Sequence, residues 1–346
     1  MKSSVAIVMG LVRSGKTAVC GETMKNQYII DGIKPFFNKV IVSDFYGWKR
    51  RPWVIAQFIL ALITHRKAVL ILSTSAQNIY PLIKVLYYVP HKLRVVHWVI
   101  GGSFHKKVMN GTYKARYFDK LLVNFVESTQ MVESLKKCGV SNAVYVPNFK
   151  SIPNIPCHKT ASGTIRFIFL SRIIPQKGVD YILEAAKQLN TYGLSRKFTI
   201  DFFGEIEKSY EQDFKQKISG AKNIAYKGLL KLREPGGYEK LTEYDMMLFP
   251  SYWKGEGFAG VFIDAFIAGL PVLASDWNFN PEIIEHGKTG LVIPVHSVSA
   301  LHDAMLEVIE DKIDLRKMSE NCRAQAAALD VSRVITQELF TNVHIL

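Results

Sequence analysis

The stretch from Lys254 to Val272 carries residues that could bind a polar ligand. Glu256 lies in a glycine-rich turn, Asp264 follows eight residues later in a predicted helix, and that helix is expected to end at Gly269. Backbone N–H groups at the start of a helix have no partner within it and attract anions. A carboxylate such as that of Glu256 can accept hydrogen bonds from sugar hydroxyls. The stretch therefore predicts a site for an anionic, hydroxyl-bearing ligand.

Two cations, Arg172 and Lys177, lie between a strand pattern and a helical pattern. The strand is predicted over Ile165–Leu170, and helical spacing of apolar residues begins at Val179. Charge-assisted hydrogen bonds to phosphate are strong, and an arginine can make two of them at once. The pair therefore favours a phosphate grip over two solvated surface cations.

Together these segments resemble the retaining glycosyltransferases of family 4, within the glycosyl transferases group 1, which have the GT-B fold. The family pattern here is E-G-F-x5-E-A-x-A-x-G-x-P-V-[IV]-A. The matching residues are Glu256, Gly257, Phe258, Ala265, Ala268, Gly269, Pro271, Val272 and Ala274. The second acid is Asp264 where the family has Glu, which shortens that side chain by one methylene.

Further segments match the family's motifs in the family's order. Ser171–Asp180 is similar to G-R-x4-K-G-x-D, after a strand and at the start of a helix. The other matching segments are Phe202-Phe203-Gly204, Lys227-Gly228, Pro281–Ile284 and Gly287–Gly290. The resemblance covers residues 163–295, and it is specific because several motifs occur together at the right spacing.

The resemblance implies an enzyme that moves a glycosyl group from a UDP-, GDP- or ADP-sugar to an acceptor hydroxyl with retention at the anomeric carbon. No metal and no cofactor are expected. Arg172 and Lys177 would grip the donor diphosphate, and Glu256 would contact the donor sugar. Asp264 would bind the ribose. The remaining donor-binding residues would be Gly15, Gly204, Gly228, Leu229, Gly257, Phe258, Ala259, Gly260 and Val261. The acceptor is expected to be a lipid-linked saccharide or a polysaccharide or glycolipid intermediate.

The first half of the chain resembles the family only loosely. The family commonly has a histidine near the end of a middle strand, and here His97 and His105 flank that place without clearly occupying it. Both are weak candidates, beside the alternative that they are packing or surface histidines. Gly101 and Gly102 follow the strand and suggest either a close backbone approach to a ligand or a tight turn.

A competing motif lies at Gly10–Thr17, which has the formal P-loop pattern G-x4-G-K-T between a strand and a helix. The strand Val40–Asp44 could then hold Mg²⁺. This would make the protein a P-loop NTP-dependent enzyme, but the second half of the chain would have no explanation. We therefore interpret Gly15 as part of the glycine-containing loop that faces the donor phosphates in the resembled family.

The whole chain reads as two doubly wound α/β domains facing across a cleft. The N-terminal, acceptor-side domain is expected over residues 1–150 and the nucleotide-sugar domain over 151–330, with a linker at Lys150–Gly163. A last helix around Val331–Val343, within 331–346, is expected to pack back towards the first domain. Expected strands are Val5–Met9, Lys39–Ser43, Ala68–Ser73, Arg94–Ile100, Ile165–Leu170, Phe198–Phe203, Ile224–Lys227, Met246–Phe249, Pro271–Ala274 and Leu291–Ile293.

The positive charge is concentrated in the first half. Residues 1–150 hold 22 Lys and Arg against 6 Asp and Glu, a net of +16, whereas residues 151–346 have a net of −2. Such asymmetry favours an anionic partner, and no nucleic-acid recognition motif accompanies it. The apolar segment Trp53–Ile63 lies between two basic clusters, Lys49–Arg51 and His65–Lys67.

These features predict docking on an anionic membrane surface. In this interpretation Trp53, Phe58 and Ile59 insert at the headgroup boundary, with a second basic cluster at Lys106, Lys107, Lys114 and Arg116. The alternative is that Pro52–Thr64 is an ordinary helix covering the sheet. No apolar run reaches the ~18–20 residues that span a bilayer. The scattered cysteines favour a reducing compartment, so we expect a cytoplasmic protein, peripheral on the inner face of the cell membrane.

Overall fold

A computed structural model describes residues 3–13, 21–155 and 163–346. The chain divides into two compact units. The N-terminal unit contains Met1–Ser151 and Leu329–Leu346, and the C-terminal unit contains Ile152–Ala328. The chain therefore leaves the first unit once and returns to it for its last residues. Each unit is described by itself below.

The N-terminal unit is built on a six-stranded parallel sheet in the order β2-β1-β3-β4-β5-β6. The strands are β1 (Ser3–Gly10), β2 (Phe37–Asp44), β3 (Val69–Ser73), β4 (Arg94–Trp98), β5 (Val123–Val126) and β6 (Ala143–Tyr145). The chain runs from β1 to β2 on one side and then returns to place β3 on the other. The strand order therefore reverses between β1 and β3, which is where ligands bind in open sheets of this kind.

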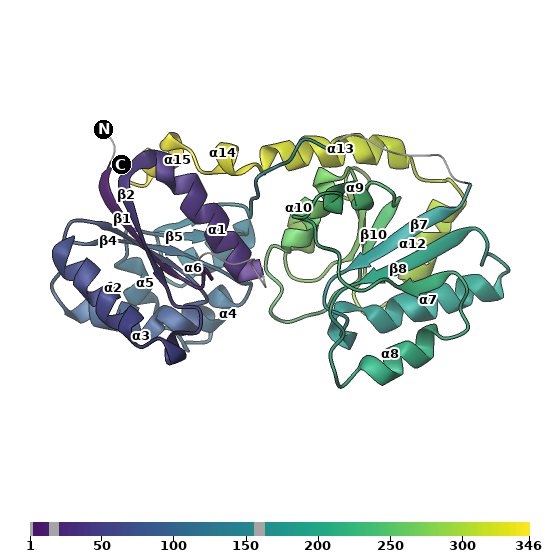
Figure 1. Cartoon of the computed structure of the whole chain (residues 1–346), viewed down its shortest axis with the longest axis horizontal. Helices are drawn as coiled ribbons and strands as arrows, with labels where there is room; N and C mark the ends of the chain where they lie inside the picture. Colours follow the sequence, from purple (N-terminus) through teal and green to yellow (C-terminus); the bar gives the residue numbers. More distant parts are fainter. Residues whose placement is uncertain (1–2, 14–20, 156–162) are drawn as a thin grey trace. The chain divides into compact units, whose positions relative to one another are not determined.

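Helices cover both faces of this sheet (Figure 1). On one face α1 (Gly21–Ile33), α14 (Val331–Val334) and α15 (Gln337–Asn342) pack on the strands, with Ala6, Ile29 and Phe340 in a shared core. The other helices are α2 (Trp53–Thr64), α3 (Ala76–Tyr88), α4 (Phe104–Met109), α5 (Ala115–Asp119) and α6 (Thr129–Lys137), with short 3-10 turns η1 (Lys34–Phe36) and η2 (Trp48–Arg50).

The C-terminal unit repeats the plan with strand order β12-β11-β10-β7-β8-β9, again all parallel. Its strands are β7 (Ile165–Leu170), β8 (Phe198–Phe203), β9 (Ile224–Tyr226), β10 (Met246–Phe249), β11 (Val272–Ser275) and β12 (Gly290–Ile293). Here the order reverses between β7 and β10. The loops that leave these two strands are therefore expected to frame a ligand site.

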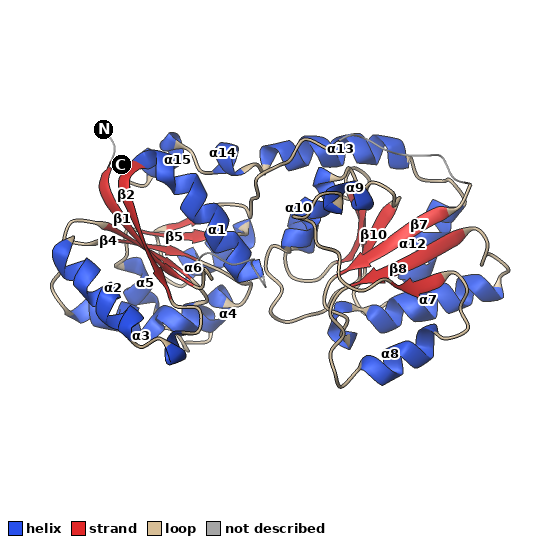
Figure 2. Ribbon diagram, viewed as in Figure 1, coloured by secondary structure: helices blue, strands red, loops and turns tan. Residues whose placement is uncertain are grey.

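Helices, drawn in blue in Figure 2, lie on both sides of this sheet. One face carries α7 (Val179–Thr191), α8 (Glu211–Ile218) and α12 (Val298–Ile309), which share a core with Phe169 and Phe202. The rest are α9 (Gly237–Leu241), α10 (Gly260–Ile267), α11 (Asn280–Ile283), α13 (Leu315–Ala328) and the 3-10 turn η3 (Pro175–Lys177). Two doubly wound α/β domains, as predicted, are confirmed.

Some elements differ from the expectation. The last helix, expected to be continuous, is two short ones because Asp330 and Thr336 each cap a separate start. Phe58 was expected to face a membrane, but it is buried and its ring meets that of Phe45 edge to face at 5.6 Å. Among the described helices, none combines the length and apolar composition that crossing a membrane requires.

Candidate active site

Two loops meet where the strand order of the C-terminal unit reverses. The loop after β7 ends at Gly178, and the loop after β10 begins at Pro250. Gly178 has φ of +78°, and a Cβ on it would lie 2.1 Å from the carbonyl oxygen of Pro250. Tyr252 also donates its backbone N–H to the Gln176 carbonyl at 2.9 Å. The two loops are therefore held in close contact, and only glycine fits at their junction.

This contact brings Lys177 and Glu256 together as a buried ion pair. Their side chains are 7% and 11% exposed, and Lys177 Nζ donates to Glu256 Oε2. The same oxygen accepts a hydrogen bond from Ser251 Oγ at 3.0 Å. Burial lowers the pKa of Lys177, with a smaller contribution from the nearby Arg172, while Glu256 acts in the opposite direction. The two charged residues, which come from separate sequence motifs, thus lie together in one buried site.

Aromatic rings support the cations of this site. The Arg172 guanidinium lies 5.3 Å from the centre of the Trp253 ring, and the Lys177 ammonium 5.1 Å from that of Phe249. Trp253 is itself fixed, because Trp277 Nε1 donates to its carbonyl at 2.8 Å. Arg172 is exposed, so the site has one buried and one accessible cation for an anionic ligand.

The glycine-rich turn after Glu256 leads into α10, as predicted. Ala259 is the N-cap in extended conformation and has no side chain with which to cap the helix. The first N–H groups of the helix lack intrahelical acceptors and lie in the segment 259–261. These N–H groups carry a positive partial charge, and in the sequence they lie shortly after Glu256 of the ion pair. Gly257, Phe258, Gly260 and Val261 belong to this same turn and helix start.

Asp264 lies in the middle of α10 and is buried. Its Oδ1 accepts a hydrogen bond from the Tyr238 hydroxyl of α9 at 2.7 Å. The predicted ribose contact would therefore have to share this carboxylate with Tyr238. Tyr238 was not identified from the sequence, because nothing in the pattern around it distinguishes it from a surface tyrosine.

Gly204 and Gly228 line up beside the loop after β7. Gly204 has φ of +147°, and a Cβ there would lie 1.7 Å from the Ser171 carbonyl oxygen. Its N–H donates to the Gly228 carbonyl at 2.9 Å, which joins the loops after β8 and β9. Leu229 follows and is 65% exposed. These predicted donor-binding positions thus form one row along the carboxyl edge of the sheet.

The candidates of the first half have different surroundings. Gly15 lies outside the described residues, as do Ser14 and Lys16–Thr17 of the formal P-loop. Gly101 has φ of +95° with open space around it, which fits a turn, and Gly102 follows it. His105 is buried in α4, and burial together with Lys106 lowers its pKa to about 4.

His97 is part of the core rather than of an exposed site. It lies on β4 and is fully buried against the rings of Phe104 and Phe118. Asn124 donates to Phe118 and Asn142, so its Oδ1 faces His97 and accepts from Nδ1 at 3.0 Å. Burial lowers the pKa of His97 to about 4, so the ring is neutral at physiological pH.

The Asp44 side chain accepts hydrogen bonds from backbone N–H groups. Its Oδ1 accepts from the N–H groups of Val12, Arg13 and Tyr46 at 2.9–3.1 Å. The carboxylate that the P-loop interpretation would assign to Mg²⁺ therefore holds together the loops after β1 and β2. This arrangement favours a structural role for Asp44.

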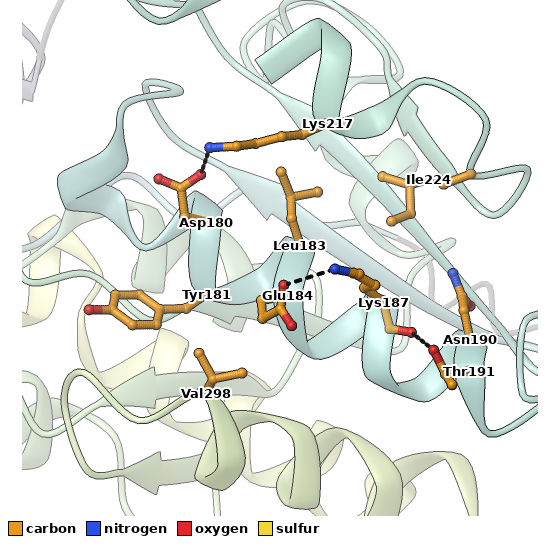
Figure 3. A pocket seen from close by; sticks show the side chains of 11 residues that line it. Asp180, Tyr181, Leu183, Glu184, Lys187, Asn190, Thr191, Lys217, Ile224 and Val298 are labelled. Carbon is orange, nitrogen blue, oxygen red and sulfur yellow. Dashed lines mark hydrogen bonds and ion pairs between the residues drawn. The ribbon is translucent and has the colours of Figure 1, made fainter. Parts of the chain in front are cut away.

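A large pocket of about 860 Å³ lies elsewhere in the C-terminal unit, along α7 (Figure 3). Its charged side chains pair with one another: Asp180 with Lys217 at 2.7 Å and Glu184 with Lys187 at 3.9 Å. It opens beside the helices and not where the strand order reverses. We assign no ligand to it.

Comparison with known proteins places these features in a family. Residues 152–325 match the family model described as glycosyl transferases group 1. A poly(ribitol-phosphate) alpha-N-acetylglucosaminyltransferase of Staphylococcus aureus is 25% identical over 213 residues, covering 61% of this chain and 41% of that protein. An Escherichia coli UDP-Gal:alpha-D-GlcNAc-diphosphoundecaprenol alpha-1,3-galactosyltransferase is 28% identical over 159 residues, covering 45% of this chain and 39% of that protein.

The fold has close counterparts among solved structures. The crystal structure of Anabaena HepE in complex with UDP aligns with a TM-score of 0.74 at 15% identity, covering 99% of this chain and 100% of that one. The fold is therefore that of GT-B glycosyltransferases. The matches span only about two fifths of the length of the two curated relatives named above. The family model nevertheless covers half of this chain, and the chain belongs to the glycosyl transferases group 1 family.

Proposed function

We propose that this protein is a retaining, family 4 glycosyltransferase of the hexosyltransferase type that uses a nucleotide-diphosphate sugar. The observation that carries the proposal is the convergence of Arg172, Lys177 and Glu256 beside the start of α10, where the strand order of the C-terminal unit reverses. This arrangement has positive charge for a diphosphate and a carboxylate for sugar hydroxyls. The two curated relatives named above support the same reaction class by their names.

In the proposed reaction the acceptor hydroxyl oxygen forms a bond to the donor's anomeric carbon. The bond from that carbon to the diphosphate oxygen breaks, and the hydroxyl proton passes to the departing diphosphate. Arg172, Lys177 and the α10 N–H groups stabilise the negative charge that develops on the leaving group. We propose that these groups suffice without a metal ion. Glu256 would exchange its bond with Lys177 for donor hydroxyls.

The donor is proposed to be a UDP-, GDP- or ADP-sugar, with Asp264 near the ribose and Gly228 and Leu229 near the base. Thermal shifts with UDP, GDP and ADP test this, because a ligand that binds only the folded state stabilises it. We expect one diphosphate to raise the melting temperature in the presence of EDTA. If none of the three diphosphates raises the melting temperature, the proposed donor site is wrong. If binding or turnover requires Mg²⁺, the proposal that the reaction needs no metal ion is wrong.

The acceptor is proposed to be a lipid-linked saccharide or a polysaccharide or glycolipid intermediate, taken by a protein that is cytoplasmic and peripheral on the membrane. The E. coli relative acts on a diphosphoundecaprenol-linked sugar by its name. In this chain Trp53, Leu60 and Ile63 of α2 are all more than half exposed. Basic residues precede and follow that helix. An apolar helix face bordered by cations fits an anionic bilayer surface.

A further inference from the structure

A second pocket lies at the carboxyl ends of β1, β2 and β3 in the N-terminal unit. It has a volume of about 700 Å³ and includes Met9 and Gly10 at the end of β1, Leu11 after it, Phe45–Arg50 after β2, and Thr74 after β3. This is where the strand order of this sheet reverses, between β1 and β3. The position is thus the same, relative to its own sheet, as that of the candidate donor site in the other unit.

The loop after β2 gives the pocket an aromatic wall. Phe45, Tyr46 and Trp48 all line it, and the latter two are partly exposed at 38% and 41%. Large flat rings with one polar atom suit a ligand that is partly apolar and partly hydroxylated. Asn78 and Thr74 add polar groups to the lining. The pocket is therefore amphipathic.

The loop after β2 also provides three cations. One of them, Arg51, is bonded within the loop, and the other two, Lys49 and Arg50, are exposed. Arg51 donates to the backbone carbonyls of Asp44 and Tyr46 and lies 3.8 Å from the Asp44 carboxylate. Lys49 and Arg50 line the pocket and are exposed, and neither forms an ion pair with a described residue. Arg51 thus fixes the loop, while Lys49 and Arg50 lie ready for an anion.

An apolar stripe continues from the pocket along α2. Ile55 lines the pocket and is 37% exposed, and Ile59 and Ile63 follow at intervals of four residues with 50% and 55% exposure. Residues at this spacing lie on one face of a helix. The stripe leaves exposed apolar surface that begins at the pocket wall.

We propose that this pocket binds the acceptor and that the acceptor is a saccharide linked to a lipid through a phosphate. This rests on the proposed function and names the substrate class of its acceptor side. The phosphate binds Lys49 and Arg50, the saccharide lies against Tyr46 and Trp48, and the lipid chain follows the Ile55–Ile59–Ile63 stripe. A free, uncharged polysaccharide would use neither the stripe nor the two cations, and a free anionic one would not use the stripe.

Calorimetric titration of the full chain with three probes tests the proposal. Farnesyl phosphate carries both the tail and the phosphate, farnesol only the tail, and inorganic phosphate only the anion. We expect farnesyl phosphate to bind at least about tenfold more tightly than either of the others. The double variant Lys49→Ala/Arg50→Ala should weaken it by about tenfold for each charge-assisted bond lost. The variant Ile59→Gln/Ile63→Gln should weaken the binding of farnesyl phosphate and leave the binding of inorganic phosphate unchanged.

The matched control is Lys136→Ala/Lys137→Ala, which removes the same charge from exposed residues of α6. It should leave binding of farnesyl phosphate unaltered. Nucleotide-diphosphate binding, measured on every variant, reports both folding and the proposed function. The proposal is overturned if the protein binds the nucleoside diphosphate but not farnesyl phosphate. It is also overturned if Lys136→Ala/Lys137→Ala weakens farnesyl phosphate binding as much as Lys49→Ala/Arg50→Ala does. Farnesyl phosphate binding without diphosphate binding would instead overturn the proposed function and leave a lipid-phosphate site.

Discussion

At the scale of single residues, the buried pair Lys177–Glu256 determines which substitutions can test ligand binding at the candidate site. Two enclosed opposite charges neutralise each other, and removing one leaves the other unpaired at a penalty of roughly 3–5 kcal/mol. Any substitution of Lys177 therefore mixes lost stability with lost ligand binding. Arg172 is exposed and makes no ion pair within the described ranges, so it is the better residue for testing the phosphate grip.

Arg172→Ala should weaken binding of the preferred nucleoside diphosphate by roughly 1.5–3 kcal/mol, the value of a hydrogen bond to a charged group. Its melting temperature without ligand should stay close to that of the wild type. Calorimetric titration measures the first and thermal unfolding the second. Arg166→Ala removes another partly exposed arginine of this unit and serves as the control. Equal diphosphate affinity in Arg172→Ala and the wild type would contradict the assignment.

Glu256→Gln should cut turnover at least about tenfold while diphosphate affinity changes little, since its proposed contact is with the sugar. A glutamine keeps an oxygen that can accept from Lys177 and Ser251, but it leaves the buried Lys177 charge without its partner. We therefore expect a lower melting temperature as well, and turnover is compared at a temperature where the variant is folded. Release of diphosphate from the donor sugar gives the rate. Full turnover in this variant would mean that Glu256 only shapes the turn.

Gly178→Ala should be more disruptive than its size suggests. The added Cβ would lie 2.1 Å from the Pro250 carbonyl oxygen, in a backbone conformation that alanine adopts at a penalty of about 1–2 kcal/mol. The loops after β7 and β10 would have to separate, and Lys177 with them. We expect lower stability and lost diphosphate binding together. Gly193→Ala, also at positive φ but in open space, should show only the conformational part.

At the scale of elements, the strands of the C-terminal unit were predictable because they are short apolar runs, and β8, β10 and β12 are directly followed by Gly204, Pro250 and Pro294. Apolar periodicity did not reveal α1, since its buried face includes Thr23, Lys25 and Asn26, and only the P-loop pattern implied a helix there. The pairing of Lys177 with Glu256 was also beyond the sequence, because it depends on which loops meet across β7 and β10. Ser251 was missed for the same reason.

The polar face of α1 contains a second buried ion pair, Lys25 with Glu127 just after β5. Both side chains are about 5% exposed, so Lys25→Met alone should destabilise the protein by roughly 3–5 kcal/mol. The double variant Lys25→Met/Glu127→Leu should recover most of that loss, because it leaves no buried charge. Chemical denaturation measures both. A double variant as unstable as the single one would show that the pair is not the reason for the loss.

The core histidine of β4 predicts a pH dependence. The pKa of His97 is lowered from 6.5 to about 4 by burial, so between these values the unfolded state binds a proton that the folded state does not. Stability should therefore fall as the pH drops from 6.5 to 4, by up to about 3 kcal/mol. His105 acts in the same direction. His97→Gln should flatten the profile, and His91→Gln, at an exposed position, should not.

At the scale of the whole molecule, the charge difference between the two halves of the sequence predicts how the protein meets a membrane. Residues 1–150 carry a net +16 and residues 151–346 a net −2. Each basic residue near an anionic surface contributes about 1 kcal/mol, and the exposed side chains of Trp53 and Leu60 add apolar contact. Vesicles containing anionic lipid should therefore sediment the protein, and recovery should decline with salt as the Debye length shortens to about 3 Å at 1 M.

The structure sharpens this experiment, because it separates exposed from buried residues of α2. Trp53→Ser and Leu60→Ser remove exposed side chains and should reduce recovery without unfolding the protein. Phe58→Ser removes a core ring and should instead lower the melting temperature by several degrees. Purely neutral vesicles should recover less protein, because they lack the surface charge that attracts the basic residues. Equal recovery with neutral and anionic vesicles would remove the electrostatic part of the argument, and no recovery with either would leave a water-soluble acceptor as the better explanation.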